Sequence, residues 1–429
     1  MFVINIMDSL ISTENKICFF FPYKELSGVP VLFSRLANHL SASSHDLTIY
    51  IIDYSDGTMV VNLKLNDNII ILPFEDGKQI TPPNDALLIM QSILPYSIRP
   101  ELKISPETRI LFWNLHPDCL IPSFIPFPFF RNLQNKSFKL YVLLANLIYR
   151  KLVNDLQSFV DDAVQKKSLV FMDKANYEKT GKYLFLKFDN IEYLPVPAIS
   201  SIRIKNTMVE SPTELNFTWI GRLCDFKFHI LVYTIKQLSL ISIKKSLKIK
   251  FSIIGDGPYK NELINLNVEH DKFKLEILGS IKPEQLDQYL LEHTDVLAAM
   301  GTSALEGAKL GIPTILLDIS YYPIKKDYKF RWLHESIDFD LGHPISEEDY
   351  KEGNNNLNKM LDDLLLNYKI ISNNSISYFR INHDINSVIK KLLIKINEAK
   401  LIYSEINPSI LKKSVLRRIF DLRHILKNY

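Results

Sequence analysis

Short apolar segments alternate with amphipathic segments along the first half of the chain. The apolar segments have the length and composition of buried strands, and five of them occupy residues 16–21, 47–52, 69–72, 85–90 and 109–113. Between the first two, residues 31–40 carry apolar side chains at the spacing of an amphipathic helix. Buried strands separated by helical crossovers predict a parallel sheet in an α/β domain. Ligands of such a sheet bind at the carboxyl ends of its strands.

A proline-rich segment then interrupts this alternation. Residues 120–130 hold three prolines among four phenylalanines, and proline at that density excludes a regular helix. The segment is compatible with an acceptor-pocket loop or with a membrane contact. A long apolar helix is predicted over 138–160, followed by a strand at 168–172 and a helix at 174–183.

A polar stretch at 203–214 divides the chain into domains. We expect one α/β domain over 1–205 and a second over 215–370. Helices are expected over 371–429, where they either cross back to the first domain or touch a membrane.

The composition is that of a globular protein. The chain has 429 residues, of which 47% are hydrophobic and 23% charged. A net charge of +3 is too small to predict nucleic-acid binding. The three cysteines are isolated from one another in the sequence, which is typical of a reducing compartment. The N-terminal segment does not resemble a signal peptide. No apolar run reaches the length of about 18 residues that a transmembrane helix needs. We therefore expect a cytoplasmic protein without a transmembrane helix.

The most informative motif lies at residues 300–318. Gly301, Thr302 and Ser303 precede a predicted helix that carries Glu306, and Gly311-Ile-Pro ends that helix. Unpaired N–H groups at a helix start attract phosphate, and a carboxylate one turn later can accept hydrogen bonds from a ribose. Together these features predict a nucleotide site.

Four further motifs precede this one along the chain. They occupy 217–227 with Gly-Arg-Leu and a lysine, 251–258 with Gly-Asp-Gly-Pro, 278–281 and 294–297. In this order and spacing the set resembles the donor-binding half of the GT-B glycosyltransferases, and the GT4-like group in particular. Each motif is weak alone, and the order of all of them makes the resemblance specific.

The resemblance implies a GT-B fold, in which two Rossmann-like domains have parallel sheets facing a cleft, followed by C-terminal helices. Residues 1–205 would form the acceptor-side domain and residues 215–370 the nucleotide-sugar domain. Arg222 and Lys227 would stabilise the negative charge on the leaving nucleoside diphosphate, as this family does without a metal.

The same resemblance assigns the other donor-binding residues of the second domain. Gly301 and Thr302 would supply backbone amides to the diphosphate, with Ser303 beside them. Glu306 would hold the ribose, and the backbone at Ile281 would read the base.

Two residues of the first domain match the family pattern as well. His116 follows a predicted strand and would face the donor sugar, where a histidine can donate a hydrogen bond or transfer a proton. Gly28 would let the backbone approach the diphosphate and acceptor. A histidine packed in a loop and an ordinary turn glycine are the simpler alternatives.

Two observations limit the analogy. GT4-like proteins have a glutamate eight residues before Glu306, and this chain has Ala298 there. Recognition of the donor sugar therefore differs from the typical member, and the sequence leaves retention or inversion open. Asp53 and Asp56 have a spacing that suits a metal, but Asp56-Gly57 is more simply a turn. We expect no metal and no other cofactor.

The C-terminal stretch from Ile410 to Tyr429 carries six basic residues and one acidic residue. Its leucines and isoleucines recur at helical spacing, which is typical of a helix on an anionic membrane. A closing helix that packs on the first domain explains the same pattern, and both interpretations stay open.

Together these features predict a metal-independent glycosyltransferase that moves a sugar from a nucleotide-sugar donor to a glycan or lipid-linked acceptor. The family suggests bacterial surface polysaccharide biosynthesis, such as O-antigen or capsule, at the inner face of the cell membrane. The alternatives are a nucleotide-sugar 2-epimerase of the same fold and a non-catalytic GT-B-like binding subunit.

Overall fold

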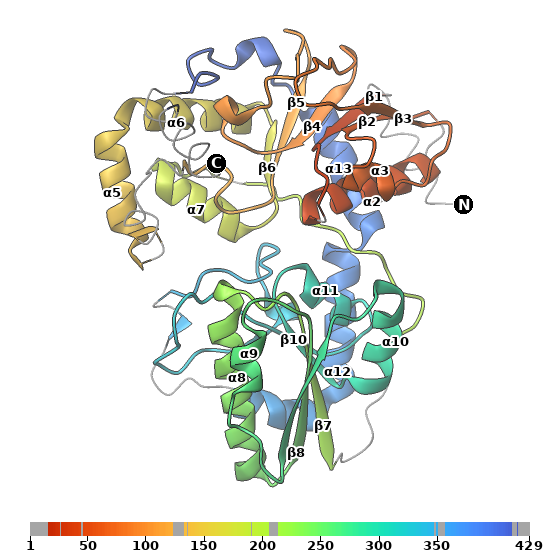
Figure 1. The fold of residues 1–429 in the computed structure, drawn as a ribbon, viewed down its shortest axis with the longest axis vertical. Coiled ribbons are helices and arrows are strands. Elements are labelled where there is room, and N and C mark those ends of the chain that lie inside the picture. The colour runs from red at the N-terminus through yellow and green to blue at the C-terminus, as the bar shows by residue number, and fades with distance from the viewer. Residues whose placement is uncertain are drawn as a thin grey trace. The chain divides into compact units, whose positions relative to one another are not determined.

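Two compact units make up the chain (Figure 1). One contains Met1–Val196 and Val388–Tyr429, and the other contains Pro197–Ser387. The computed structural model describes residues 16–25, 27–43, 46–122, 133–134, 136–189, 191–205, 213–346, 349–350, 357–413 and 418.

A parallel sheet of six strands, in the order β3-β2-β1-β4-β5-β6, forms the centre of the first unit. Its strands are β1 Lys16–Phe20, β2 Thr48–Asp53, β3 Ile69–Pro73, β4 Leu87–Gln91, β5 Ile110–Asn114 and β6 Leu169–Phe171. The six strands predicted from residue 16 to residue 172 are present. The apolar run at 193–198 also predicts a strand, and this prediction is wrong, because Tyr193 forms only an isolated bridge with Phe171. The order reverses between β1 and β4, which makes the edge beyond these two strands a natural ligand site.

Helices connect these strands in chain order. They are α2 Gly28–Ser43, α3 Thr58–Val61, α5 Phe138–Ile148, α6 Arg150–Gln165 and α7 Lys174–Leu184. The single helix predicted over 138–160 is wrong. The backbone of Tyr149 leaves the helical region at φ −120° and ψ 30°, and α5 and α6 are separate helices. Neither proline nor glycine marks this break in the sequence.

Residues from the end of the chain complete the first unit. Helix α13, Ile385–Glu398, brings the chain back to it. Leu401, Ile406 and Ile410 then belong to its buried core, and the N–H of Ile110 donates to the carbonyl of Leu401 at 3.0 Å. Ile410 thus begins the predicted basic stretch as a core residue. Residues 414–417 and 419–429 of that stretch lie outside the described residues.

The second unit repeats the same architecture. Its sheet has the order β12-β11-β10-β7-β8-β9, and only the edge strand β12 is antiparallel to its neighbour. The strands are β7 Glu214–Ile220, β8 Lys248–Ile254, β9 Phe273–Gly279, β10 Val296–Ala299, β11 Thr314–Leu316 and β12 Arg331–Trp332. The helices are α8 Asp225–Lys245, α9 Lys260–Ile264, α10 Pro283–His293, α11 Thr302–Ala308 and α12 Leu357–Asn382. Here the order reverses between β7 and β10.

Both faces of the sheet in the second unit are buried. Phe217, Trp219 and Phe251 lie on one face, and Thr218 and Ser252 lie on the other. All five are buried, as expected for strands covered on two faces. Within the described part of the chain, no helix combines the length and apolar character needed to cross a membrane.

Candidate nucleotide-binding site

The motifs singled out in the sequence lie at the carboxyl edge of the second sheet. Arg222 and Lys227 follow β7, and Gly301, Thr302 and Ser303 follow β10. Strands β7 and β10 are hydrogen-bonded neighbours, and they are the two strands at which the order reverses. This is where an open α/β sheet binds its ligand.

Lys227 is a half-buried cation at this edge, and its ammonium lies over the ring of Phe226, 5.8 Å from the ring centroid. It lies in the first turn of α8, where the positive end of the helix dipole disfavours a cation. A Cβ added to Gly221 would lie 3.2 Å from Lys227 Nζ, so the ammonium stands against the end of β7. Burial lowers the pKa of Lys227, yet its ammonium has no acidic partner among the described residues. A bound anion would compensate each of these costs.

Arg222 adds a second positive charge in the loop between β7 and α8. Its side chain is exposed, and no described carboxylate pairs with it. Two cations five residues apart, neither with an acidic partner among the described residues, are suited to a ligand with two phosphates.

The Gly-Asp-Gly-Pro turn after β8 packs against the loop that follows β7. A Cβ on Gly255 would lie 2.0 Å from the carbonyl oxygen of Gly221, and one on Gly257 would lie 2.2 Å from that of Leu223. The N–H of Leu223 also donates to the carbonyl of Asp256 at 2.9 Å. Only glycine permits these backbones to approach so closely, so the motif is architectural.

Gly301 is the N-cap residue of α11, with φ 62° and ψ −152°. Its N–H donates to the carbonyl of Leu341 at 2.6 Å, so this amide is not free for the diphosphate as the sequence suggested. The N–H groups of Thr302 and Ser303 remain at the helix start, where no side chain caps them.

Glu306 lies one turn further along α11. Its carboxylate is 2.6 Å from Lys309 Nζ, which is also 2.8 Å from a carboxylate oxygen of Asp287. Burial acts to lower the pKa of Lys309, but Glu306 and Asp287 outweigh burial and raise it. Glu306 therefore has a structural partner three residues further along the chain.

Ile281 follows β9, two strands from β7 in the sheet. It is half-buried in the loop that leads to α10. The N–H of Gly255 donates to the carbonyl of Gly279 at 2.8 Å, which joins this loop to the neighbouring turn.

Gly28 and His116 belong to the first unit. Gly28 begins α2 after β1, and a Cβ there would meet nothing within 4 Å, so space alone does not require glycine. His116 follows β5, and its Nδ1 accepts the N–H of Asp118 at 3.1 Å. Burial lowers the pKa of His116, which favours a neutral ring that carries its proton on Nε2.

Asp53 is a structural residue of the first unit. Its buried carboxylate accepts the N–H groups of Tyr23, Tyr54 and Met59 at 2.8 to 2.9 Å. Asp56 is exposed and pairs with Lys24 at 3.1 Å. These bonds agree with the turn interpretation of the Asp53 and Asp56 pair.

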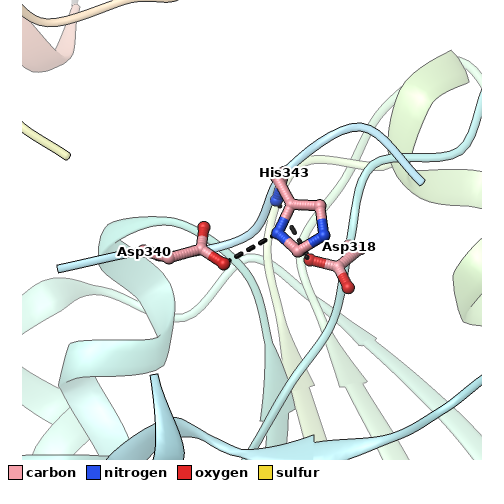
Figure 2. Close-up of side chains that lie close together, drawn as sticks. All are labelled: Asp318, Asp340 and His343. Carbon is pink, nitrogen blue, oxygen red and sulfur yellow. Dashed lines mark hydrogen bonds and ion pairs between the residues drawn. The ribbon is translucent and has the colours of Figure 1, made fainter. Parts of the chain in front are cut away.

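A largely buried charge cluster that the sequence did not predict lies at the end of β11. Figure 2 shows three of its members, Asp318, Asp340 and His343. We call it the Asp318 cluster, and its members are Asp318, Tyr328, Arg331, Asp340, His343 and Asp349. Arg331 Nη2 donates to Asp318 Oδ1 and to Asp340 Oδ2, both at 2.8 Å. His343 Nδ1 is 2.7 Å from Asp340 Oδ2, and its Nε2 is 3.1 Å from Asp349 Oδ1.

Two members of the Asp318 cluster are cations. Burial acts to lower the pKa of His343, but hydrogen bonds to Asp340 and Asp349 and the nearby carboxylates raise it to about 10. Possible metal-ligand atoms of Asp318, Asp340 and His343 lie within 4.8 Å of one another. However, Arg331 already occupies both carboxylates, and a protonated histidine cannot bind a metal. The cluster therefore suits internal ion pairing better than a metal.

The Asp318 cluster also supports the start of α11. His343 donates its backbone N–H to Asp318 Oδ1 at 3.0 Å. This bond fixes the loop in which Leu341 accepts the N–H of Gly301. An aspartate directly after an apolar strand was the one local signal for the cluster.

Comparison with known proteins identifies the fold. No protein family and no curated protein matches the chain. A glycosyltransferase from Rickettsia africae ESF-5 is similar in structure, with a TM-score of 0.52 and 14% identity over 94% of this chain and 100% of that one.

Two further solved structures are less similar. The N-terminal domain of Candida albicans trehalose-6-phosphate phosphatase has a TM-score of 0.49 and 12% identity, covering 90% of this chain and 97% of its own. WaaG, a glycosyltransferase involved in lipopolysaccharide biosynthesis, has a TM-score of 0.46 and 14% sequence identity. The match covers 89% of this chain and 99% of WaaG. The two Rossmann-like units and the Rickettsia similarity show a GT-B fold.

Proposed function

We propose that this protein is a glycosyltransferase that moves a sugar from a nucleotide-sugar donor to a glycan or lipid-linked acceptor. The observation that carries the proposal concerns Lys227, at the strand-order reversal of the second sheet and five residues after Arg222. Among the described residues neither cation has an acidic partner. A GT-B fold with two such cations at that edge is suited to a nucleoside diphosphate.

In the proposed reaction the bond between the anomeric carbon and the diphosphate oxygen breaks. The acceptor hydroxyl oxygen bonds to that carbon, and its proton passes to an oxygen of the released diphosphate. Negative charge then accumulates on the diphosphate, where Lys227 and Arg222 stabilise it. The N–H groups of Thr302 and Ser303 bind further phosphate oxygens.

The other proposed roles concern the ribose, the base and the donor sugar. Glu306 accepts hydrogen bonds from the ribose, and the backbone at Ile281 contacts the base. In the first unit, the Nε2–H of His116 is suited to donate to the donor sugar, and Gly28 allows close backbone approach. Lys227 and Arg222 supply the positive charge that a metal ion would otherwise provide, so we propose a metal-independent reaction.

The proposed setting is bacterial surface polysaccharide biosynthesis at the inner face of the cell membrane. It rests on the family resemblance of the motifs. Because Ile410 is buried, membrane contact by the C-terminal stretch is proposed only for residues beyond 413.

Calorimetry with UDP and GDP tests the proposed nucleotide site. Arg222→Ala should weaken binding of the preferred nucleotide by about 1.5–3 kcal/mol, because a charge-assisted contact is lost. Lys244→Ala is the matched control, because Lys244 is an exposed cation in the last turn of α8. Equal affinity of Arg222→Ala and wild type would contradict the site.

A nucleotide-release assay with candidate donors and acceptors tests the reaction itself. Nucleotide release that is accompanied by formation of a glycosylated acceptor supports a transferase. Binding without turnover favours the non-catalytic subunit, and conversion of the donor to its 2-epimer favours the epimerase.

A further inference from the structure

Helix α5 exposes an apolar face in addition to the face that it buries. Leu140, Leu143 and Leu147 are 44%, 65% and 79% exposed. Residues three, four and seven positions apart share one face of a helix, so these leucines form one row. Ile148 extends the row and is 51% exposed.

The opposite face of α5 accounts for its folding. Tyr141, Val142 and Ala145 are buried in the core of the first unit. The hydroxyl of Tyr141 donates to the carbonyl of Pro122 at 2.7 Å. The exposed leucines are therefore not needed to attach the helix, and Figure 1 shows α5 at the outer edge of its unit.

Other described helices expose apolar side chains more sparsely. Helix α12 exposes three large ones over its 26 residues, and α8 exposes Leu240 and Ile243 over 21. Helix α5 exposes four within 11 residues. Single exposed apolar residues are ordinary, whereas a contiguous row indicates an interaction surface.

Positive charge surrounds this row. Lys136 and Lys139 lie at one end, and Arg150 and Lys151 lie at the other. All four are exposed, and none has an acidic partner among the described residues. The sequence from 119 to 154 contains no aspartate or glutamate.

We propose that α5 docks the protein onto the surface of an anionic phospholipid bilayer. Leu140, Leu143 and Leu147 would insert between lipids while the flanking cations contact phosphate groups. A second copy of this face is a poor partner, because a symmetric contact would bring like charges together. An 11-residue helix is too short to span a bilayer, so α5 would lie in its surface.

Co-sedimentation of the full chain with vesicles tests the docking surface. The vesicles contain phosphatidylcholine alone or with about one third phosphatidylglycerol. Wild type should bind the anionic vesicles, and binding should weaken as salt rises from about 0.1 to about 0.5 M. The triple variant Leu140→Ser, Leu143→Ser and Leu147→Ser should lose at least about tenfold in partitioning.

Two further variants separate the contributions. Changing Lys136, Lys139, Arg150 and Lys151 to glutamine should remove the preference for anionic vesicles. Leu240→Ser with Ile243→Ser on α8 is the matched control and should bind like wild type. Thermal unfolding of each variant confirms that the fold is kept, since all substituted side chains are exposed.

Three results would overturn the proposal: no sedimentation of wild type with anionic vesicles, unchanged sedimentation of the triple leucine variant, or an equal loss in the α8 control. A change from dimer to monomer in the triple variant, without vesicle binding by wild type, would assign the row to self-association. The test needs no nucleotide or sugar, so its outcome is independent of the proposed reaction.

Discussion

The guanidinium of Arg331 binds both carboxylate oxygens of Asp318, with Nη2 2.8 Å from Oδ1. Asp318 is fully buried at the end of β11, and Arg331 comes from the antiparallel edge strand β12. A paired and hydrogen-bonded carboxylate is tolerated in a protein interior, whereas an unpaired one is not. This pair therefore holds β12 and the 340–343 loop beside the start of α11.

Arg331→Met should destabilise the protein strongly, because it leaves Asp318 buried without its cation. We expect a loss of about 3–5 kcal/mol in the free energy of unfolding, measured by urea denaturation. Arg99→Met is the matched control, because the Arg99–Asp76 pair is exposed, and it should cost at most about 1 kcal/mol. Similar losses for both variants would show that the Arg331–Asp318 pair contributes no more to the free energy of unfolding than an exposed ion pair does.

The contribution of His343 to stability should depend on pH. Its pKa is raised to about 10 in the folded protein from an ordinary value of 6.5. Because the folded pKa is the higher one, the stabilisation is complete below about pH 6.5 and is lost as pH rises toward 10. The stability difference between wild type and His343→Gln should therefore shrink by about 2–4 kcal/mol between pH 6 and pH 10.

Asp349→Asn provides the control for this pH dependence. It removes one of the carboxylates that hydrogen-bond His343, so the same comparison in that background should show a smaller change. A difference that stays constant over the range would mean that His343 is neutral in the folded protein.

Lys227→Met should separate stability from binding. Burial lowers the pKa of Lys227, so the protonated side chain destabilises the fold at neutral pH. Methionine has a similar length and no charge, and the melting temperature should stay equal or rise. Nucleoside diphosphate affinity should fall at least about tenfold. A lower melting temperature with unchanged affinity would assign Lys227 to structure alone.

Glu306→Ala should weaken nucleotide binding through the ribose. The loss should be large for the ribonucleotide and nearly absent for a 2′,3′-dideoxy analogue, as measured by calorimetry. Asp287→Ala is the matched control, because Asp287 is the other partner of Lys309. If both variants weaken binding equally, the effect passes through Lys309 rather than through a ribose contact.

Turnover should persist in the presence of EDTA. The cations required at the leaving group are Arg222 and Lys227, and Asp53 already accepts three backbone N–H groups. Product formation is measured before and after chelation, with Mn²⁺ restored as the control. Activity that disappears with EDTA and returns with Mn²⁺ would contradict the metal-independent proposal.

Local patterns in the sequence determined much of the architecture. Apolar runs placed all six strands of the first sheet, because burial of a strand on two faces requires a continuous apolar segment. Glycine and proline placed the turns after β7, β8 and β10, because those backbones need conformations or close approaches that other residues resist. The positions of Arg222, Lys227 and Thr302 at one sheet edge follow from that order of elements.

Only the tertiary structure decided how charges and surfaces are partnered. Arg331 on the edge strand β12 and His343 in a loop lie 13 and 25 residues from Asp318 along the chain, and no local sequence pattern predicts such pairing. That Lys227 has no carboxylate partner among the described residues depends likewise on what packs nearby. The pair of Glu306 and Lys309 is different, because an i,i+3 spacing on one helix follows from the sequence. The exposed leucines of α5 have the same composition as a buried helix face. The sequence shows that these side chains are apolar. Whether they are exposed depends on which other elements pack over them.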